Sequence, residues 1–146
     1  VLGNGAYRNA PPLLNPVNDA RRMAEVLRGA GFEVILGTDL DRRETEELLR
    51  RFGDRLEGGA IGLFFYAGHG VQVGGENYLL PVEARLLRER DLAFDAVPLS
   101  GVLRTMESAA PTNLLFLDAC RDNPLARTLA SAPGTRSTVG QGLAQV

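Results

Sequence analysis

Two short segments of this sequence carry residue types that together could perform nucleophilic chemistry. Residues 66–70 contain the only histidine, His69, and residues 118–122 contain the only cysteine, Cys120. Each segment follows an apolar run that predicts a buried strand. Catalytic groups collect at the carboxyl ends of parallel strands, and a right-handed crossover would place these two strands side by side. We therefore expect the thiol and the imidazole to lie close together.

A neighbouring imidazole would convert the Cys120 thiol into a nucleophile. His69 would lower the pKa of the thiol or accept its proton, which gives a thiolate. The backbone N–H groups of Gly70 and Cys120 are the natural donors to the oxyanion formed on the attacked carbonyl group. A lone cysteine is more often a small buried hydrophobe, and a lone histidine is more often a satisfied polar group. Their joint placement at two strand ends favours the catalytic interpretation.

Two carboxylates could act beside this pair. Asp118 lies two residues before Cys120, so in an extended segment both side chains point to the same face. A carboxylate at the end of an apolar strand is either a structural hydrogen-bond acceptor or a partner for a cationic substrate side chain. Asp19 falls in the first turn of a predicted helix, where its ordinary role is to interact with the helix dipole.

The segments that would position these residues alternate between strand and helix, which predicts an α/β domain with a mainly parallel sheet. Asn15 followed by Pro16 predicts a capped helix start, and glycines at 29 and 31 predict its end. The unbroken apolar run at 60–67 predicts a central strand buried on both faces. The other predicted elements are a first strand ending at 1–2, a strand at 32–36, a helix from about 41 to 56, a hairpin over 71–80, a short helix at 98–106 and a strand at 113–119.

Composition limits the classes of protein to which the chain could belong. Its 146 residues suffice for one domain with a substantial core, and its net charge of −2 gives no general attraction to nucleic acid or anionic membranes. One cysteine excludes an intrachain disulfide, and one cysteine with one histidine cannot form a zinc cluster within the chain. No stretch approaches the ~18 apolar residues of a membrane span, and no signal-like segment is present. We expect a cytoplasmic protein, although a targeting segment could precede Val1.

Four motifs resemble the caspase-like cysteine peptidases, in particular their prokaryotic metacaspase type, and together they extend over nearly the whole chain. They are Gly-Asn-Gly-Ala-Tyr at 3–7, Leu-Asn-Pro-Val-Asn-Asp-Ala at 14–20, Tyr-Ala-Gly-His-Gly at 66–70 and Leu-Asp-Ala-Cys-Arg-Asp-Asn-Pro at 117–124. The separation of His69 and Cys120 is also close to the roughly 50 residues between base and nucleophile in caspases. One departure is Asp-Ala-Cys-Arg-Asp, where many metacaspases have Asp-Ser-Cys-His-Ser-Gly. It leaves the His–Cys pair intact and could alter the pocket around it.

The resemblance implies a caspase-like three-layer α/β sandwich, with a mostly parallel, twisted sheet and helices on both faces. It also implies a cysteine endopeptidase in which His69 and Cys120 form a catalytic dyad and cleave peptide bonds through a thioester. Metacaspases prefer Arg or Lys before the scissile bond, and the acids of their pocket correspond to Asp118 and Asp19. Such a pocket should favour arginine, which a carboxylate can bind at two points. The implied partners are peptide and protein substrates, with no role for nucleic acid or a membrane.

The same resemblance implies the organisation of the chain and its ligands. Residues 1–125 correspond to the catalytic, large-subunit part, and residues 126–146 to a linker or processing segment leading to a small subunit that this chain does not contain. Arg127 and Arg136 in that segment are candidate self-cleavage sites or ordinary solvated arginines. No cofactor is required. Calcium activates several metacaspases, and Glu83 and Asp95 lie roughly where its ligands would be, but they are fewer than the six or more oxygens calcium usually takes.

Two other classes of protein remain as alternatives to the peptidase. A catalytically silent caspase-fold module could act as an interaction scaffold, although such modules often lose the dyad that this chain keeps. A different cysteine hydrolase, or a nucleotide-binding domain using Gly3 and Gly5 near a phosphate, is the other alternative. Against nucleotide binding, no helix follows these glycines directly, and the Gly-x-Gly-x-x-Gly pattern is absent.

Overall fold

A computed structural model describes residues 1–146 except 57, 59–60, 121–123, 134–137, 141–142 and 144–146, and it describes Cys120, Pro124 and Gly140 by their main chains only. Its helices are α1 (Pro16–Gly29), α2 (Arg42–Leu56), the 3-10 turn η1 (Glu89–Asp91), α3 (Leu92–Asp95), α4 (Leu99–Ala109) and α5 (Pro124–Ala130). Its strands are β1 (Leu2–Gly3), β2 (Gly37–Thr38), β3 (Ile61–Val73), β4 (Glu76–Leu79), β5 (Val97–Pro98), β6 (Thr112–Cys120) and β7 (Val139–Gly140).

The long strand β3 organises the sheet. It pairs in parallel with β6 over nine residue pairs, from Ile61 beside Thr112 to His69 beside Cys120. On its other edge β3 pairs in parallel with β1, which in turn pairs in parallel with β2. From Gly70 onward β3 forms an antiparallel hairpin with β4, and β5 and β7 extend this antiparallel part. The parallel part and the antiparallel part therefore meet at His69.

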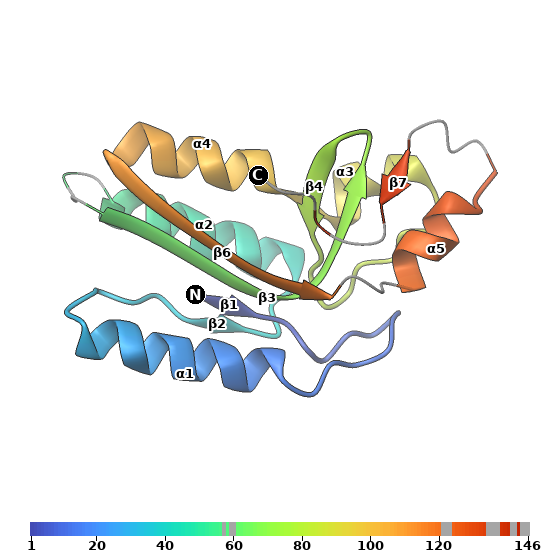
Figure 1. The fold of residues 1–146 in the computed structure, drawn as a ribbon. Coiled ribbons are helices and arrows are strands. Elements are labelled where there is room, and N and C mark those ends of the chain that lie inside the picture. The colour runs from blue at the N-terminus through green and yellow to red at the C-terminus, as the bar shows by residue number, and fades with distance from the viewer. Residues whose placement is uncertain (57, 59–60, 121–123, 134–137, 141–142, 144–146) are drawn as a thin grey trace.

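Helices cover both faces of the sheet (Figure 1). On one face, Ala20 of α1 forms a buried cluster with Phe65 and Ala67 of β3. On the opposite face, α2 and α4 cluster with the alternate β3 side chains Phe64 and Tyr66. This alternation is what a strand buried on both faces requires. The predicted α/β fold with helices on both faces is confirmed, and the sheet is mixed, with its longest ladder parallel.

The first helix begins at the predicted residue, Pro16, whose restricted φ suits the first turn of a helix. The predicted cap is wrong, because the Asn15 side chain makes no capping hydrogen bond. The helix also approaches β1 very closely. A Cβ atom on Gly3 would lie 2.6 Å from the Cβ atom of Ala20, so a glycine at this position allows the close packing of α1 on the sheet.

Two segments differ from the expected secondary structure. Residues 32–36 are not a regular strand, and only Gly37 and Thr38 pair with β1. Just before this ladder, the Val1 amino group donates to the Ile35 carbonyl oxygen at 2.9 Å. Residues 124–130 form α5, so the expected linker at 126–146 begins inside a helix. Leu125 and Leu129 of α5 are buried in a cluster with Val71, so this part of the segment belongs to the folded core.

None of the helices in the described part of the chain combines the length and the apolar character that crossing a lipid bilayer demands.

Candidate active site

The strands β3 and β6 place the main chains of His69 and Cys120 side by side. The two residues are partners in the parallel ladder, and neighbouring strands lie about 4.8 Å apart. Cys120 is the last residue of β6. His69 was expected just beyond a strand end, and this expectation is wrong, because β3 continues through His69 into the hairpin with β4. The side chain of Cys120 lies outside the described residues.

The imidazole of His69 is buried, with 2% of the residue exposed. Its Nε2 atom lies 3.2 Å from the carbonyl oxygen of Pro11. Burial lowers the pKa of His69, and the hydrogen bond to Pro11 opposes this shift in part. A neutral ring that donates its Nε2–H to Pro11 carries its lone pair on Nδ1. That Nδ1 atom is buried and has no hydrogen-bond partner among the described residues.

Two tyrosines hold the main chain of His69. The N–H group of His69 donates to Oη of Tyr7 at 2.7 Å, and its carbonyl oxygen accepts from Oη of Tyr66 at 2.6 Å. The rings of Tyr7 and His69 also pack together, with centroids 4.4 Å apart. Sequence reasoning assigned no role to these tyrosines. The available signal was that both belong to the glycine-containing motifs at 3–7 and 66–70.

Two glycines flank His69, and each has a close neighbour. A Cβ atom on Gly68 would lie 2.7 Å from the hydroxyl oxygens of both Tyr7 and Tyr66, so a glycine there leaves room for the hydroxyls. A Cβ atom on Gly70 would lie 2.6 Å from the side chain of Leu143. Gly70 pairs with Leu79 in the hairpin. Its N–H group as an oxyanion donor, like that of Cys120, stays a prediction.

The two aspartates expected to bind a substrate lie on one side of the sheet. Asp118 is exposed and pairs in register with Ala67. Because Ala67 packs on α1, and in-register residues of parallel strands point to the same face, Asp118 faces the α1 side. Asp19 lies in the first turn of α1, half-buried. The structure therefore presents both residues on the face of the sheet that carries α1.

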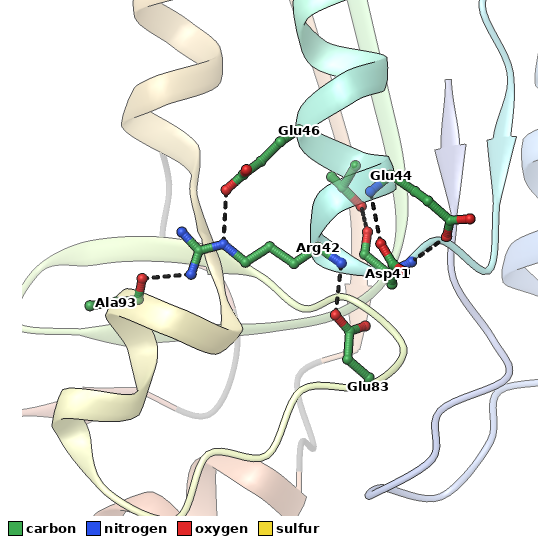
Figure 2. Close-up of polar contacts among 7 residues, drawn as sticks. Asp41, Arg42, Glu44, Glu46, Glu83 and Ala93 are labelled. Atoms are coloured by element: carbon green, nitrogen blue, oxygen red, sulfur yellow. Dashed lines mark hydrogen bonds and ion pairs between the residues drawn. The ribbon is translucent and has the colours of Figure 1, made fainter.

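The weak calcium candidates Glu83, which Figure 2 shows, and Asp95 both bind main-chain groups. Oε1 of Glu83 accepts a hydrogen bond from the backbone N–H of Arg42 at 2.8 Å, at the start of α2. Oδ2 of Asp95 accepts from the backbone N–H of Arg85 at 3.0 Å. Across the described ranges, no group of three or more His, Cys, Asp or Glu residues could hold a metal ion.

One of the two candidate self-cleavage sites, Arg127, lies among the described residues. Arg127 is exposed on α5. Proteases generally bind their substrates as extended chains, so cleavage at Arg127 would require this helix to unwind. Arg136 lies outside the described residues.

The N–H groups of residues 5 and 6, in the loop proposed to bind a phosphate, are already bound within the chain. The N–H groups of Gly5 and Ala6 both donate to Oδ1 of Asp39, at 2.7 and 2.8 Å. The loop thus already binds a carboxylate from within the chain, which does not support the nucleotide-binding alternative.

Comparison with known proteins identifies the family. The model of the caspase domain family matches residues 1–143. The mucosa-associated lymphoid tissue lymphoma translocation protein 1 of Homo sapiens is 30% identical over 122 residues, which cover 83% of this chain. The homolog of that protein from Mus musculus matches with the same identity and coverage. The chain spans 14% of the length of these curated relatives. On the family match over nearly its whole length, this chain belongs to the caspase domain family.

Proposed function

We propose that this chain is the catalytic part of a cysteine endopeptidase of the metacaspase type, which cleaves peptide bonds after arginine or lysine. Membership of the caspase domain family supports cysteine-peptidase chemistry. One observation carries the assignment of the dyad. His69 is paired in register with Cys120, the chain's single cysteine, and its buried Nδ1 atom has no hydrogen-bond partner among the residues that the structure describes.

In this mechanism His69 is first a base and then an acid. Nδ1 accepts the proton of the Cys120 thiol, and the thiolate attacks the carbonyl carbon of the scissile bond. The oxyanion accepts hydrogen bonds from the N–H groups of Gly70 and Cys120, each contributing roughly 3 kcal/mol by analogy with other hydrolases. The imidazolium gives its proton to the leaving amine, which departs and leaves a thioester. Water, deprotonated by Nδ1, then hydrolyses the thioester and releases the Cys120 thiol.

Asp118 and Asp19 would select the substrate side chain. Both carry carboxylates on the α1 side of the sheet, and Asp118 lies two residues before the nucleophile. A carboxylate binds the planar guanidinium group through two parallel hydrogen bonds, whereas a lysine ammonium is a single point charge. We therefore expect arginine to be preferred over lysine.

The edge of β6 is the place where a small subunit would join the sheet. Within the described residues, no strand pairs with β6 on the edge opposite β3. Leu114 and Phe116 of β6 are 40% and 47% exposed. Both pair with β3 residues that pack against the α1 side. An unpaired edge next to exposed apolar side chains supports the addition of a further strand and its covering helix.

A peptide panel tests this proposal. Fluorogenic peptides with arginine, lysine or aspartate before the cleaved bond are offered to the intact protein and to its Cys120→Ala variant. We expect the arginine peptide to be cleaved fastest and the Cys120→Ala variant to be inactive while retaining its circular dichroism spectrum. Turnover that survives Cys120→Ala would contradict the proposal. Failure of the wild-type protein to cleave any peptide would favour the silent interaction module, and a preference for aspartate would overturn only the pocket assignment.

A further inference from the structure

A gap in the hydrogen-bonded ladder of β3 coincides with His69. On one edge of β3, pairing with β1 reaches Ala67, and pairing with β4 begins at Gly70. His69 lies between these two ladders. Buried backbone groups in such a position need partners, because an unsatisfied group costs free energy. Here the partner of the N–H group is not a strand but the hydroxyl group of Tyr7.

The two hydroxyl groups form a network in which every proton has an acceptor. Tyr66 donates to the His69 carbonyl oxygen at 2.6 Å, which also accepts from the Leu80 N–H group at 3.1 Å. Tyr7 accepts the His69 N–H and can donate its own proton to the carbonyl oxygen of Leu80 at 3.2 Å. The two hydroxyl oxygens are 3.3 Å apart. Two buried tyrosine side chains therefore bind both main-chain polar groups of His69.

The same loop that carries Tyr7 also supplies the partner of the imidazole. Pro11, whose carbonyl oxygen binds Nε2 of His69, lies four residues after Tyr7. This loop is closed on itself by hydrogen bonds from the N–H groups of Tyr7 and Leu13 to the Gly5 carbonyl oxygen. The Tyr7 ring packs on the imidazole at 4.4 Å with a 50° tilt. The loop that contains Tyr7 and Pro11 thus binds the N–H group of His69, packs against its ring and determines its tautomer.

We propose that Tyr7 and Tyr66 are positioning residues, whose hydroxyl groups hold the His69 peptide so that the imidazole keeps Nε2 on Pro11 and presents Nδ1 as the base. This inference rests on the proposed function for its catalytic consequence, but its structural part concerns His69 alone. The two hydroxyl groups bind the main chain of His69 and not its imidazole. Each acts through the orientation of His69, and a misplaced base slows the chemical step more than it weakens substrate binding.

Phenylalanine variants test the proposal, because they keep the rings and remove the hydroxyls. The chain has three tyrosines, so Tyr78→Phe on β4 is a matched control. Tyr7→Phe and Tyr66→Phe should each lower kcat roughly tenfold or more, with KM within about twofold of wild type. The single histidine also allows an unambiguous nitrogen-15 NMR measurement of its tautomer. We expect the distinct Nδ1 and Nε2 signals of wild type to move toward each other in both variants and to be unchanged in Tyr78→Phe.

Folded Tyr7→Phe and Tyr66→Phe variants with wild-type kcat and wild-type nitrogen signals would overturn the proposal. If the variants do not fold, hydrogen exchange in the wild-type protein decides the question. The His69 amide should exchange far more slowly than an exposed amide, and rapid exchange would overturn the tyrosine network. Absence of peptidase activity in the wild type would remove the proposed function, while the NMR and exchange results would still decide whether the tyrosines hold His69.

Discussion

Two regions of the molecule use polar side chains to bind main-chain groups, and they differ in what is left unbound. At the start of α2 (Figure 2), Oδ1 of Asp41 accepts from the Glu44 N–H at 2.8 Å, and Oε2 of Glu44 accepts from the Asp41 N–H at 2.9 Å. This reciprocal pair is a capping box. Beside it, Arg42 forms an ion pair with Glu46 and donates to the carbonyl oxygen of Ala93. These contacts lie near the surface and stabilise the helix start.

Around His69 the main chain is equally well bound, but one ring nitrogen is not. Nδ1 is buried without a partner among the described residues. Within the described ranges one oxygen of Glu83 is also buried without a hydrogen-bond partner, but its other oxygen accepts from the backbone N–H of Arg42 at the start of α2. The polar cluster at the start of α2 stabilises the fold, whereas the cluster around His69 leaves the proton acceptor Nδ1 available. We expect substitutions in the two regions to have different consequences.

The largest loss of stability and activity should follow from adding a methyl group at Gly68, next to the two tyrosine hydroxyls. In Gly68→Ala the new Cβ atom would lie 2.7 Å from both hydroxyl oxygens. Overpacking and the loss of buried hydrogen bonds should lower the free energy of unfolding by about 3 kcal/mol, measured by urea denaturation, and abolish peptidase activity. Gly101→Ala on α4 is the control, because its nearest atoms would be 3.9 Å away. Equal stability of the two variants would show that the hydroxyls do not need this space.

The next effect concerns the substrate pocket beside the dyad. Asp118→Asn removes the negative charge and leaves the size of the side chain unchanged. We expect kcat/KM for an arginine peptide to fall roughly 30-fold, which corresponds to a loss of about 2 kcal/mol of transition-state stabilisation. The free energy of unfolding should not change. Asp19→Asn should act in the same direction. Glu25→Gln, an exposed carboxylate on α1, and Asp54→Asn, an exposed one on α2, are controls. Loss of activity in the controls to the same degree would indicate a general charge effect.

A smaller effect is expected in the other region. Asp41→Ala removes the acceptor of the Glu44 N–H and opens the capping box. The free energy of unfolding should fall by about 1 kcal/mol, as for other helix caps, while kcat/KM stays at the wild-type value. The comparison of the two regions would break down if Asp41→Ala reduced activity in a folded protein.

The smallest effect is a dependence of stability on pH. Burial lowers the pKa of His69 below its ordinary value of 6.5. As pH falls below 6.5, the unfolded chain binds a proton at this residue before the folded chain does, so folding stability decreases toward acid. The free energy of unfolding of wild type relative to His69→Gln should therefore rise with pH up to about 6.5 and then level off. A difference that does not change with pH, or that increases toward acid, would contradict a buried neutral imidazole.

Local sequence patterns predicted the elements that position the site. The apolar run before His69 and the apolar run before Cys120 became the paired strands β3 and β6. Pro16 marked the start of α1, and the Arg- and Glu-rich segment after Asp41 became α2. Each of these signals is contained within a few neighbouring residues, which is why they could be read without knowledge of the tertiary structure.

Other features depend on contacts that are distant in sequence. His69 was expected just beyond the end of the apolar strand, but Gly68 accommodates the hydroxyl of Tyr7, a residue 61 positions earlier, without interrupting β3. The role of Tyr7 could not be inferred from the residues near it. The helix α5 is only seven residues long, and burial of Leu125 and Leu129 against the hairpin stabilises it more than its own composition does.

The reactivity of Cys120 tests the central claim most directly. The chain contains one cysteine and one histidine, so alkylation by iodoacetamide at pH 7 reports on a single thiol. An ordinary thiol with a pKa of about 8.5 is only a few per cent thiolate at this pH. Assistance by His69 predicts that wild type reacts at least roughly tenfold faster than a folded His69→Ala variant. Equal rates of alkylation in the two proteins would contradict the assignment of His69 as the base of Cys120.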